Sequence, residues 1–253
     1  MNILVTGGGT IAPIDDVRQV SNLSTGRFSS AISEAALRRG HEVWHLHAPG
    51  AIVPFAERSR YNLEADPASE FARLAALKVE WDGHDDRFHL VSMRRGTVSE
   101  YAEMLRATLL ARPIDAIILA MAVSDYAPEP ESGKLGSGLE SRTLRLQRLP
   151  KVIDSVREWA PEAYLVGFKL LSGSTEAYLI ERAARAAVVT RSDLTVANDL
   201  GLLKAGRHTI HLVRPGHRTE TVGPGADLAG TLIDRVATWS VEQRITAAAE
   251  PDR

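Results

Sequence analysis

The sequence predicts an α/β protein with a Rossmann-like parallel sheet, helices on both faces and a small antiparallel extension. Short apolar strands alternate with amphipathic helices over residues 1–240, which is the pattern of a parallel sheet covered on both sides. Three glycines follow the first strand, residues 3–5, as at the ligand-binding edge of such sheets. The 253 residues are 44% hydrophobic and 25% charged, enough for one large core. We therefore expect a single domain over 1–240 and a C-terminal tail over 241–253.

The first half of the domain contains a strand-helix-strand unit, a surface excursion and a second set of elements. The excursion, residues 49–87, is rich in proline and polar residues around one helix, and we treat it as a variable segment. The predicted elements are a helix over 27–39, a strand over 42–46, the helix of the excursion over 68–78, a strand over 88–93, a helix over 97–111 and a buried strand over 116–120.

The second half continues the alternation and adds strands outside the parallel core. Residues 143–148 alternate leucine with polar residues and predict a half-exposed strand. The exposed strands leave edges that need covering, so we expect a homodimer. The other predicted elements are helices over 150–159, 175–188 and 226–239, strands over 165–168 and 194–197, a hairpin over 209–222, and frayed residues over 247–253.

The composition excludes several classes of function. The net charge is −2 without a basic run, which argues against nucleic-acid binding. The chain has no cysteine, which excludes disulfides, thiolate metal sites and cysteine nucleophiles. His45 and His47 share one strand face, but two ligands without a third are more typical of structural histidines. No signal-peptide pattern or run of 18 apolar residues is present, so we expect a cytoplasmic protein that does not bind a membrane.

Two clusters around the first loop predict the binding of phosphate or a similar anion. Gly7, Gly8 and Gly9, followed by Thr10, allow a ligand to lie against bare backbone amides. The second cluster, Asn22-Leu23-Ser24-Thr25-Gly26, supplies side chains that can cap the next helix, whose N-terminus carries a positive partial charge. Two anion-binding sites therefore flank one loop.

The same loop also fits the dinucleotide pattern G-x-G-x-x-G/A through Gly7, Gly9 and Ala12. In that pattern the helix begins within the glycine run, whereas Pro13 and the turn-forming Asp15-Asp16 interrupt a helix here. The acidic residue expected about 20 residues later to hold a ribose is also missing. An NAD(P)-dependent reductase and a glycine turn without a ligand remain alternatives.

A third loop follows the buried strand over 116–120. It begins Met-Ala-Val-Ser-Asp-Tyr, which contains Ala122 and Asp125, and continues through three glycines around a single lysine, Lys134. Open α/β sheets bind ligands at this end of their strands. The flanking glycines predict a loop that is disordered without ligand, so that Lys134 can swing towards a bound substrate.

Seven ordered motifs make the sequence similar to the phosphopantothenoylcysteine synthetase family of the coenzyme A pathway. The resemblance is closest to the stand-alone bacterial form without the fused flavin decarboxylase, and it covers residues 1–239 apart from the excursion. Fused members often carry further lysines where Gly136 and Ser137 stand here. The matching motifs are Thr6-Gly7-Gly8-Gly9-Thr10, Pro13-Ile14-Asp15-Asp16-Val17-Arg18, Ser21-Asn22-Leu23-Ser24-Thr25-Gly26, Ala122-Val123-Ser124-Asp125-Tyr126, Lys134-Leu135, Val166-Gly167-Phe168 and Ala197-Asn198-Asp199.

The resemblance implies a ligase that joins 4′-phosphopantothenate to L-cysteine. In this family the pantothenate carboxylate attacks the α-phosphate of CTP, or of ATP in eukaryotic members, with Mg²⁺ on the phosphates, and the cysteine amine then displaces the nucleotide. By position, Lys134 matches the catalytic lysine, and Asn22 matches the asparagine that holds the acyl-nucleotide intermediate. The expected nucleotide- and phosphate-binding residues are Gly7, Gly8, Gly9, Thr10, Ser24, Thr25, Gly26, Ala122, Asp125, Phe168 and Lys169.

Several of these residues also have an ordinary structural explanation. Asn22 could cap the following helix, and Lys134 could be a solvated loop charge. Asp125 could bind a ribose hydroxyl or Mg²⁺, or it could form a turn without a ligand. Lys169 could meet phosphate or extend along the surface. For the whole chain, the alternatives to the ligase are the NAD(P)-dependent reductase and a non-catalytic nucleotide-binding protein.

Overall fold

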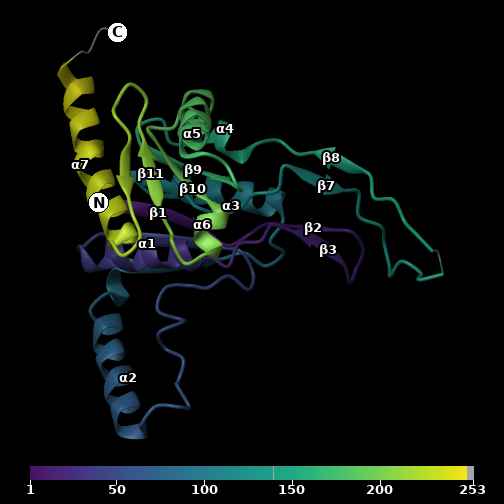
Figure 1. Ribbon diagram of the computed structural model, residues 1–253, viewed down its shortest axis with the longest axis horizontal. Helices are drawn as coiled ribbons and strands as arrows, with labels where there is room; N and C mark the ends of the chain where they lie inside the picture. The colour runs from purple at the N-terminus through teal and green to yellow at the C-terminus, as the bar shows by residue number, and fades with distance from the viewer. Residues whose placement is uncertain (139, 250–253) are drawn as a thin grey trace.

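The computed structural model, which describes residues 1–138 and 140–249, is built around one eight-stranded sheet (Figure 1). The strand order is β12-β11-β10-β9-β6-β1-β4-β5, so the order reverses at β1. The pairs β5-β4-β1-β6-β9-β10 are parallel, and β11 and β12 are added antiparallel at one edge. The strands are β1 Asn2–Gly7, β4 Glu42–His47, β5 Phe88–Ser92, β6 Ala116–Leu119, β9 Tyr164–Leu171, β10 Leu194–Asp199, β11 Ile210–Val213 and β12 Glu220–Val222.

Helices cover both faces of this sheet, which confirms the predicted Rossmann-like class. Neighbouring residues of β1 face opposite sides: Ile3 packs in one core with α1 Arg27–Arg38 and α7 Leu228–Ala249, and Leu4 packs in the other core. That second core contains α3 Val98–Ala111 and α4 Val152–Trp159. The helix α5 Glu176–Thr190 lies on the α4 side, where Leu179 and Ala183 pack against Ala197 of β10.

Two short antiparallel ribbons extend from the edge where the parallel strands end (Figure 1). One ribbon is the hairpin of β2 Ile11–Pro13 and β3 Gln19–Ser21, within a stretch for which the sequence predicted only a loop. The other is the arm of β7 Tyr126–Pro128 and β8 Leu146–Arg148. The strand predicted over 143–148 thus shrinks to β8, and it is exposed rather than half-exposed, because no helix lies against it.

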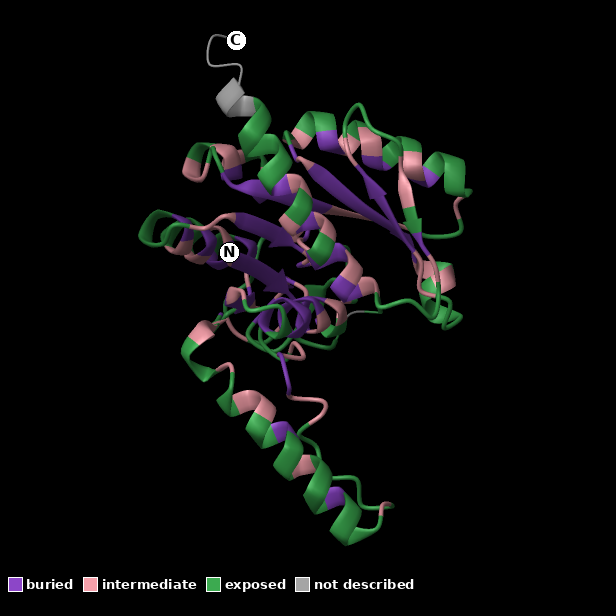
Figure 2. Ribbon diagram, turned by 90° about the vertical axis from the view of Figure 1, so that its left-hand side faces the viewer, coloured by how far each residue is buried: buried purple, intermediate pink, exposed green. Residues whose placement is uncertain are grey.

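The excursion over 49–87 projects from the body through α2 Pro67–Asp82 and ends in the single turn η1 Asp85–Arg87 (Figure 2). An ion network fixes its base to α1. The Glu34 carboxylate accepts the Phe55 N–H at 2.7 Å and pairs with Arg58 at 2.8 Å, and the other guanidinium nitrogen of Arg58 meets Glu80 of α2, also at 2.8 Å. The excursion is therefore a surface segment, as predicted, but its beginning is firmly anchored.

The C-terminal part departs most from the predicted boundaries. The helix α7 continues to Ala249, so residues 241–249 are helical rather than a tail. Their first six side chains are exposed and form no buried stripe, but glutamate, glutamine, arginine and alanine favour a helix without one. A short helix that the sequence did not predict, α6 Leu200–Lys204, follows β10. Residues 250–253 lie outside the described residues. Among the helices of residues 1–138 and 140–249, none combines the length and hydrophobicity that spanning a membrane requires.

Candidate active site

The loops that follow β1 and β6 meet where the strand order reverses, which is the usual ligand-binding position of an open α/β sheet. We call residues 7–10 the glycine loop. Ala122 donates its N–H to the Gly8 carbonyl at 2.9 Å and accepts the Thr10 N–H at 3.0 Å. The structure therefore brings together Ala122 and the glycine loop, which were predicted separately.

Close packing explains why glycine occupies this loop. A Cβ atom on Gly7 would lie 2.0 Å from Ser29 Oγ of α1, and a Cβ atom on Gly9 would lie 2.7 Å from the Asn22 carbonyl oxygen. Gly8 has a φ of +88°, which a residue with a side chain rarely adopts. The loop is thus pressed between α1 on one side and the end of the hairpin on the other.

The hairpin returns the chain so that Asn22 lies beside Gly9. Asn22 follows β3 directly, and its carbonyl oxygen accepts the N–H of Ser24 at 3.0 Å. The residue itself is exposed. Asn22 therefore stands beside the glycine loop, with its backbone against Gly9.

The N-terminus of α1 is capped by neither Asn22 nor Ser24, which corrects part of the predicted role of residues 22–25 as caps. Its N-cap residue is Gly26, with a φ of 77° and no side chain, and Thr25 Oγ1 just before it accepts the N–H of Arg27 at 3.3 Å. Since Ser29 of the first turn touches Gly7, this positive end of the helix lies next to the glycine loop. The two predicted anion-binding sites form one cradle.

The start of the excursion also contacts this cradle, which the sequence did not predict. The Ile52 N–H donates to the Thr25 carbonyl at 2.8 Å, and a Cβ atom on Gly26 would lie 3.0 Å from the Ile52 carbonyl oxygen. A Cβ atom on Gly8 would lie 2.7 Å from the Ala51 side chain. Ala51 and Ile52 are therefore part of the wall, although nothing in their residue types indicates it.

Thr10 holds the loops in place and has little left to offer a ligand. Its hydroxyl oxygen accepts the Ser124 N–H at 2.9 Å and lies 3.3 Å from Ser124 Oγ, while its own N–H is bonded to Ala122. The side chain is fully buried. Thr10 therefore positions the glycine loop against the loop after β6.

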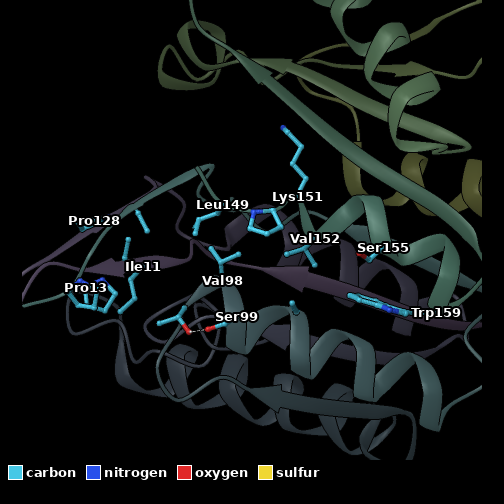
Figure 3. A pocket seen from close by; sticks show the side chains of 16 residues that line it. Ile11, Pro13, Val98, Ser99, Pro128, Leu149, Lys151, Val152, Ser155 and Trp159 are labelled. Atoms are coloured by element: carbon cyan, nitrogen blue, oxygen red, sulfur yellow. Dashed lines mark hydrogen bonds between the residues drawn. The ribbon is translucent and has the colours of Figure 1, made fainter. Parts of the chain in front are cut away.

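Asp125 is exposed and forms an ion pair with Lys151, whose Nζ lies 3.2 Å from its Oδ1. Lys151 precedes α4 and was missed, because one lysine before a helix carries no recognisable signal. It stands at the rim of an apolar cavity of about 390 Å³ between β2, β7, α3 and α4 (Figure 3). The glycine loop, Asn22 and Lys134 do not line this cavity, so it is separate from the anion cradle.

Phe168 and Lys169 of β9 point to opposite faces of the sheet. Phe168 lies on the α1 side, where its ring meets the ring of Phe28 edge to face at 6.2 Å, and Phe28 in turn meets His208 at 4.9 Å. Lys169, the next residue in the strand, therefore faces the α5 side. Of these two predicted residues, the structure brings only Phe168 to the face that carries the cradle.

Lys134 is exposed and does not lie at the glycine loop. We call residues 131–135 the lysine segment, and residues 14–18 the distal turn of the hairpin. Glu131 N–H donates to the Ile14 carbonyl at 2.9 Å, and Asp16 N–H donates to the Gly133 carbonyl at 3.2 Å. The segment is thus hydrogen-bonded to the hairpin. Five residues of extended chain, about 16 Å, separate Gly9 from Ile14.

The histidines behave as structural residues. His45 is buried, and its Nδ1 lies 2.8 Å from Ser33 Oγ. Burial, together with the nearby His47, lowers the pKa of His45 to about 3, so the ring is neutral at pH 7. Among residues 1–138 and 140–249, no three His, Asp or Glu side chains group so that they could hold a metal ion.

The fold is that of an α/β protein of the Rossmann-like type, with a glycine loop and a helix N-terminus side by side at the end of β1. Residues 1–78 and 84–239 match the family model described as the DNA/pantothenate metabolism flavoprotein C-terminal domain. The chain belongs to this family, and the resemblance seen in the sequence is confirmed.

Two named proteins are similar to this chain in sequence, and one solved structure is similar in fold. The chain is 31% identical over 212 residues to the coenzyme A biosynthesis bifunctional protein CoaBC of Thermococcus kodakarensis, covering 83% of this chain but only 44% of the relative. It is 32% identical over 224 residues to phosphopantothenate–cysteine ligase 1 of Arabidopsis thaliana, covering 78% and 69%. A crystal structure of the DNA/pantothenate metabolism flavoprotein from Streptococcus pneumoniae superposes with a TM-score of 0.74 at 26% identity, covering 94% of this chain and 99% of that one.

Proposed function

We propose that this protein is a nucleotide-dependent ligase that joins 4′-phosphopantothenate to L-cysteine through an acyl-nucleotide intermediate, with CTP or ATP as co-substrate. The observation that carries the proposal is the anion cradle with Asn22 beside it, in a family whose members include a named phosphopantothenate–cysteine ligase. Both the nucleotide and 4′-phosphopantothenate carry phosphate groups. Backbone amides and a helix N-terminus can bind such groups without specific side chains, so the cradle suits these substrates.

Each part of the site has a role in this reaction. The backbone of the glycine loop and the N-terminus of α1 hold phosphate groups, and Asn22 contacts the acyl nucleotide. Mg²⁺ would arrive on the nucleotide phosphates and neutralise part of their charge, and Asp125, which is exposed three residues after Ala122, is the carboxylate that would meet it. Lys134 offsets the charge that develops on the α-phosphate as the carboxylate attacks.

The structure around the glycine loop favours this ligase over an NAD(P)-dependent reductase. In a dinucleotide-binding fold the helix begins within the glycine run, whereas here the hairpin intervenes and α1 begins only at Arg27. The strand β4, where an acidic residue would hold a ribose, ends in His47, whose Nε2 is already bonded to Ser92. Both features leave the reductase without its usual contacts.

The position of Lys134 makes a homodimer part of the proposal. The segment that carries Lys134 is bonded to the distal turn of the hairpin rather than to the glycine loop, so this lysine must either move with the hairpin or act on the site of a second copy. The arm of β7 and β8 carries exposed apolar side chains at Tyr126 and Leu146, and among the strands that the structure describes it forms a sheet of two strands only, which suits pairing with a partner. Light scattering at micromolar concentration tests this, and a monomer would contradict it.

The decisive experiment is the release of pyrophosphate from CTP, or from ATP, in the presence of 4′-phosphopantothenate, with and without cysteine. We expect release in a single turnover without cysteine, and repeated turnover with it. A thermal shift with NADPH but with neither CTP nor ATP would favour the reductase, and no shift with any of them would favour a non-catalytic protein. The shift is sensitive, because a ligand at 100 times its Kd stabilises a protein by about 2.7 kcal/mol.

The variant Lys134→Gln tests the lysine within the same assay. It keeps length and polarity but removes the charge, and the loss of one such contact typically slows a reaction about 100-fold or more. Single-turnover pyrophosphate release should therefore collapse, while the attack of cysteine on pre-formed acyl nucleotide should suffer less. Near-normal release by a protein with an unchanged melting temperature would show that Lys134 is a solvated surface residue without a role in the reaction.

A further inference from the structure

The carboxylate of Asp15 joins the distal turn to the lysine segment. Its Oδ1 accepts the N–H groups of Val17 at 2.8 Å and Arg18 at 2.7 Å, which closes the turn. Its Oδ2 accepts the N–H of Leu135 at 3.0 Å and a hydrogen bond from the Arg18 guanidinium, which also reaches the Leu135 carbonyl at 3.3 Å. The two oxygens of one side chain thus hold both neighbouring segments.

This side chain is covered although it lies on a projecting hairpin. No surface of the Asp15 side chain is exposed, because its own turn and the lysine segment enclose it rather than the hydrophobic core. Burial would raise the pKa of Asp15, but the hydrogen bonds donated by Val17, Leu135 and Arg18 outweigh it and lower the pKa from 3.8 to about 2. The group is therefore an anion at neutral pH that only donors surround.

We propose that Asp15 is a positioning residue that sets the place of Lys134 through the Leu135 amide, one residue away. This inference rests on the function proposed above. Gly133 on the other side is bonded to Asp16 through its carbonyl, so Lys134 is held from both neighbours while its own side chain stays free in solvent. Such an arrangement orders the backbone of a catalytic loop without restricting the reach of its side chain.

The variant Asp15→Asn separates the two functions of the carboxylate. The amide oxygen can still accept from Val17 and Arg18 and preserve the turn, but the amide NH₂ would then face the Leu135 N–H and the Arg18 guanidinium. Because hydrogen-bond donors would then face each other, the lysine segment would lose its hydrogen bond to residue 15 and separate from the distal turn. The matched control is Asp16→Asn, because Asp16 is exposed and contributes only its backbone N–H to this contact.

The first measurement is independent of activity. A protease that cuts after lysine should cleave the folded Asp15→Asn protein after Lys134 about tenfold faster than the wild type, since cleavage follows local opening. Asp16→Asn should be cleaved like the wild type. If Asp15→Asn is too unstable, Asp15→Ser keeps a side-chain oxygen that can accept from Val17 and Arg18 to close the turn but is too short to bind the Leu135 N–H as well. Equal cleavage rates for all these proteins would overturn the proposal.

The second measurement is single-turnover pyrophosphate release in a double-mutant cycle with Lys134→Gln. We expect Asp15→Asn alone to slow release about tenfold, and to cause no further loss when the lysine is already replaced. Losses that multiply would show that Asp15 does not act through Lys134 and would overturn the proposal. A wild-type protein that releases no pyrophosphate would instead contradict the proposed ligase, and the protease assay would still decide whether Asp15 holds the segment.

Discussion

The replacement of Gly9 by alanine tests whether the contact between the glycine loop and Asn22 matters for the reaction. Gly9 does not have a positive φ, so alanine can adopt its backbone conformation. The added methyl group, however, would lie 2.7 Å from the Asn22 carbonyl oxygen. That oxygen belongs to the backbone and cannot rotate away, so the chain at Asn22 has to move.

The size of the movement follows from the geometry. Ordinary carbon–oxygen contact begins at about 3.4 Å, so Asn22 must move by about 0.7 Å from its present place. A misplacement of about 1 Å at an active site can cost about 100-fold in rate. We expect a loss of a few tens of fold, together with about 1–3 kcal/mol of stability for overpacking, which lowers the Tm by several degrees.

The assay is single-turnover pyrophosphate release, measured well below the Tm of each variant. The matched control is Gly223→Ala, because a Cβ atom there meets nothing within 4 Å and the glycine has no positive φ. The control should keep the wild-type rate and Tm. A Gly9→Ala protein that is folded and reacts at the wild-type rate would refute the view that Asn22 works from beside the glycine loop.

Three further predictions concern the site, its sharing between subunits and the excursion. Asn22→Asp should impair turnover with little change in Tm, because a carboxylate repels the anionic intermediate and Asn22 caps no helix; unchanged turnover would remove Asn22 from the site. If Lys134 serves the partner's site, a mixture of Asn22→Asp and Lys134→Gln protomers should regain about one quarter of the wild-type activity. The reason is that half of the randomly formed dimers are mixed, and each mixed dimer has one intact site. No recovery of activity would assign the lysine to the site of its own chain. Hydrogen bonds from Arg58 and Arg38 lower the pKa of Glu80 from 4.5 to about 2, so its contribution to stability is complete above pH 4.5 and is lost as the pH falls towards 2. In urea unfolding, Glu80→Gln should therefore be less stable than the wild type by about 1 kcal/mol at pH 6 but nearly equal at pH 2, and a difference independent of pH would contradict the ion pair.

Local pattern was sufficient for the scaffold. The apolar strands, the amphipathic helices and the edge at which they place the glycine loop follow from periodicity, which depends on neighbouring residues only. The apolar faces of α1 and α3 are buried in the two cores, for example at Ile32 and Leu105. The same reasoning predicted that no helix begins within the glycine run, because Pro13 interrupts a helix through its own backbone and needs no distant partner.

Short elements escaped prediction because they have no period of their own. The strands β2, β3 and β7 have three residues each, and they exist because they pair with partners rather than because of their composition. The predicted cap at Asn22 failed for a related reason: the hairpin turns this residue towards Gly9 and leaves Gly26 as the N-cap.

The amino-acid sequence by itself determined the fold class, the glycine loop and the residue types available for phosphate chemistry, because each depends on residues that are close in the chain. Only the tertiary structure decided how they are combined. Thr10 meets Ser124, and Asp15 meets Leu135, across 114 and 120 residues respectively. Hydrogen bonds over such separations depend on where the sheet and the hairpin place each loop, and that placement results from packing of the whole chain.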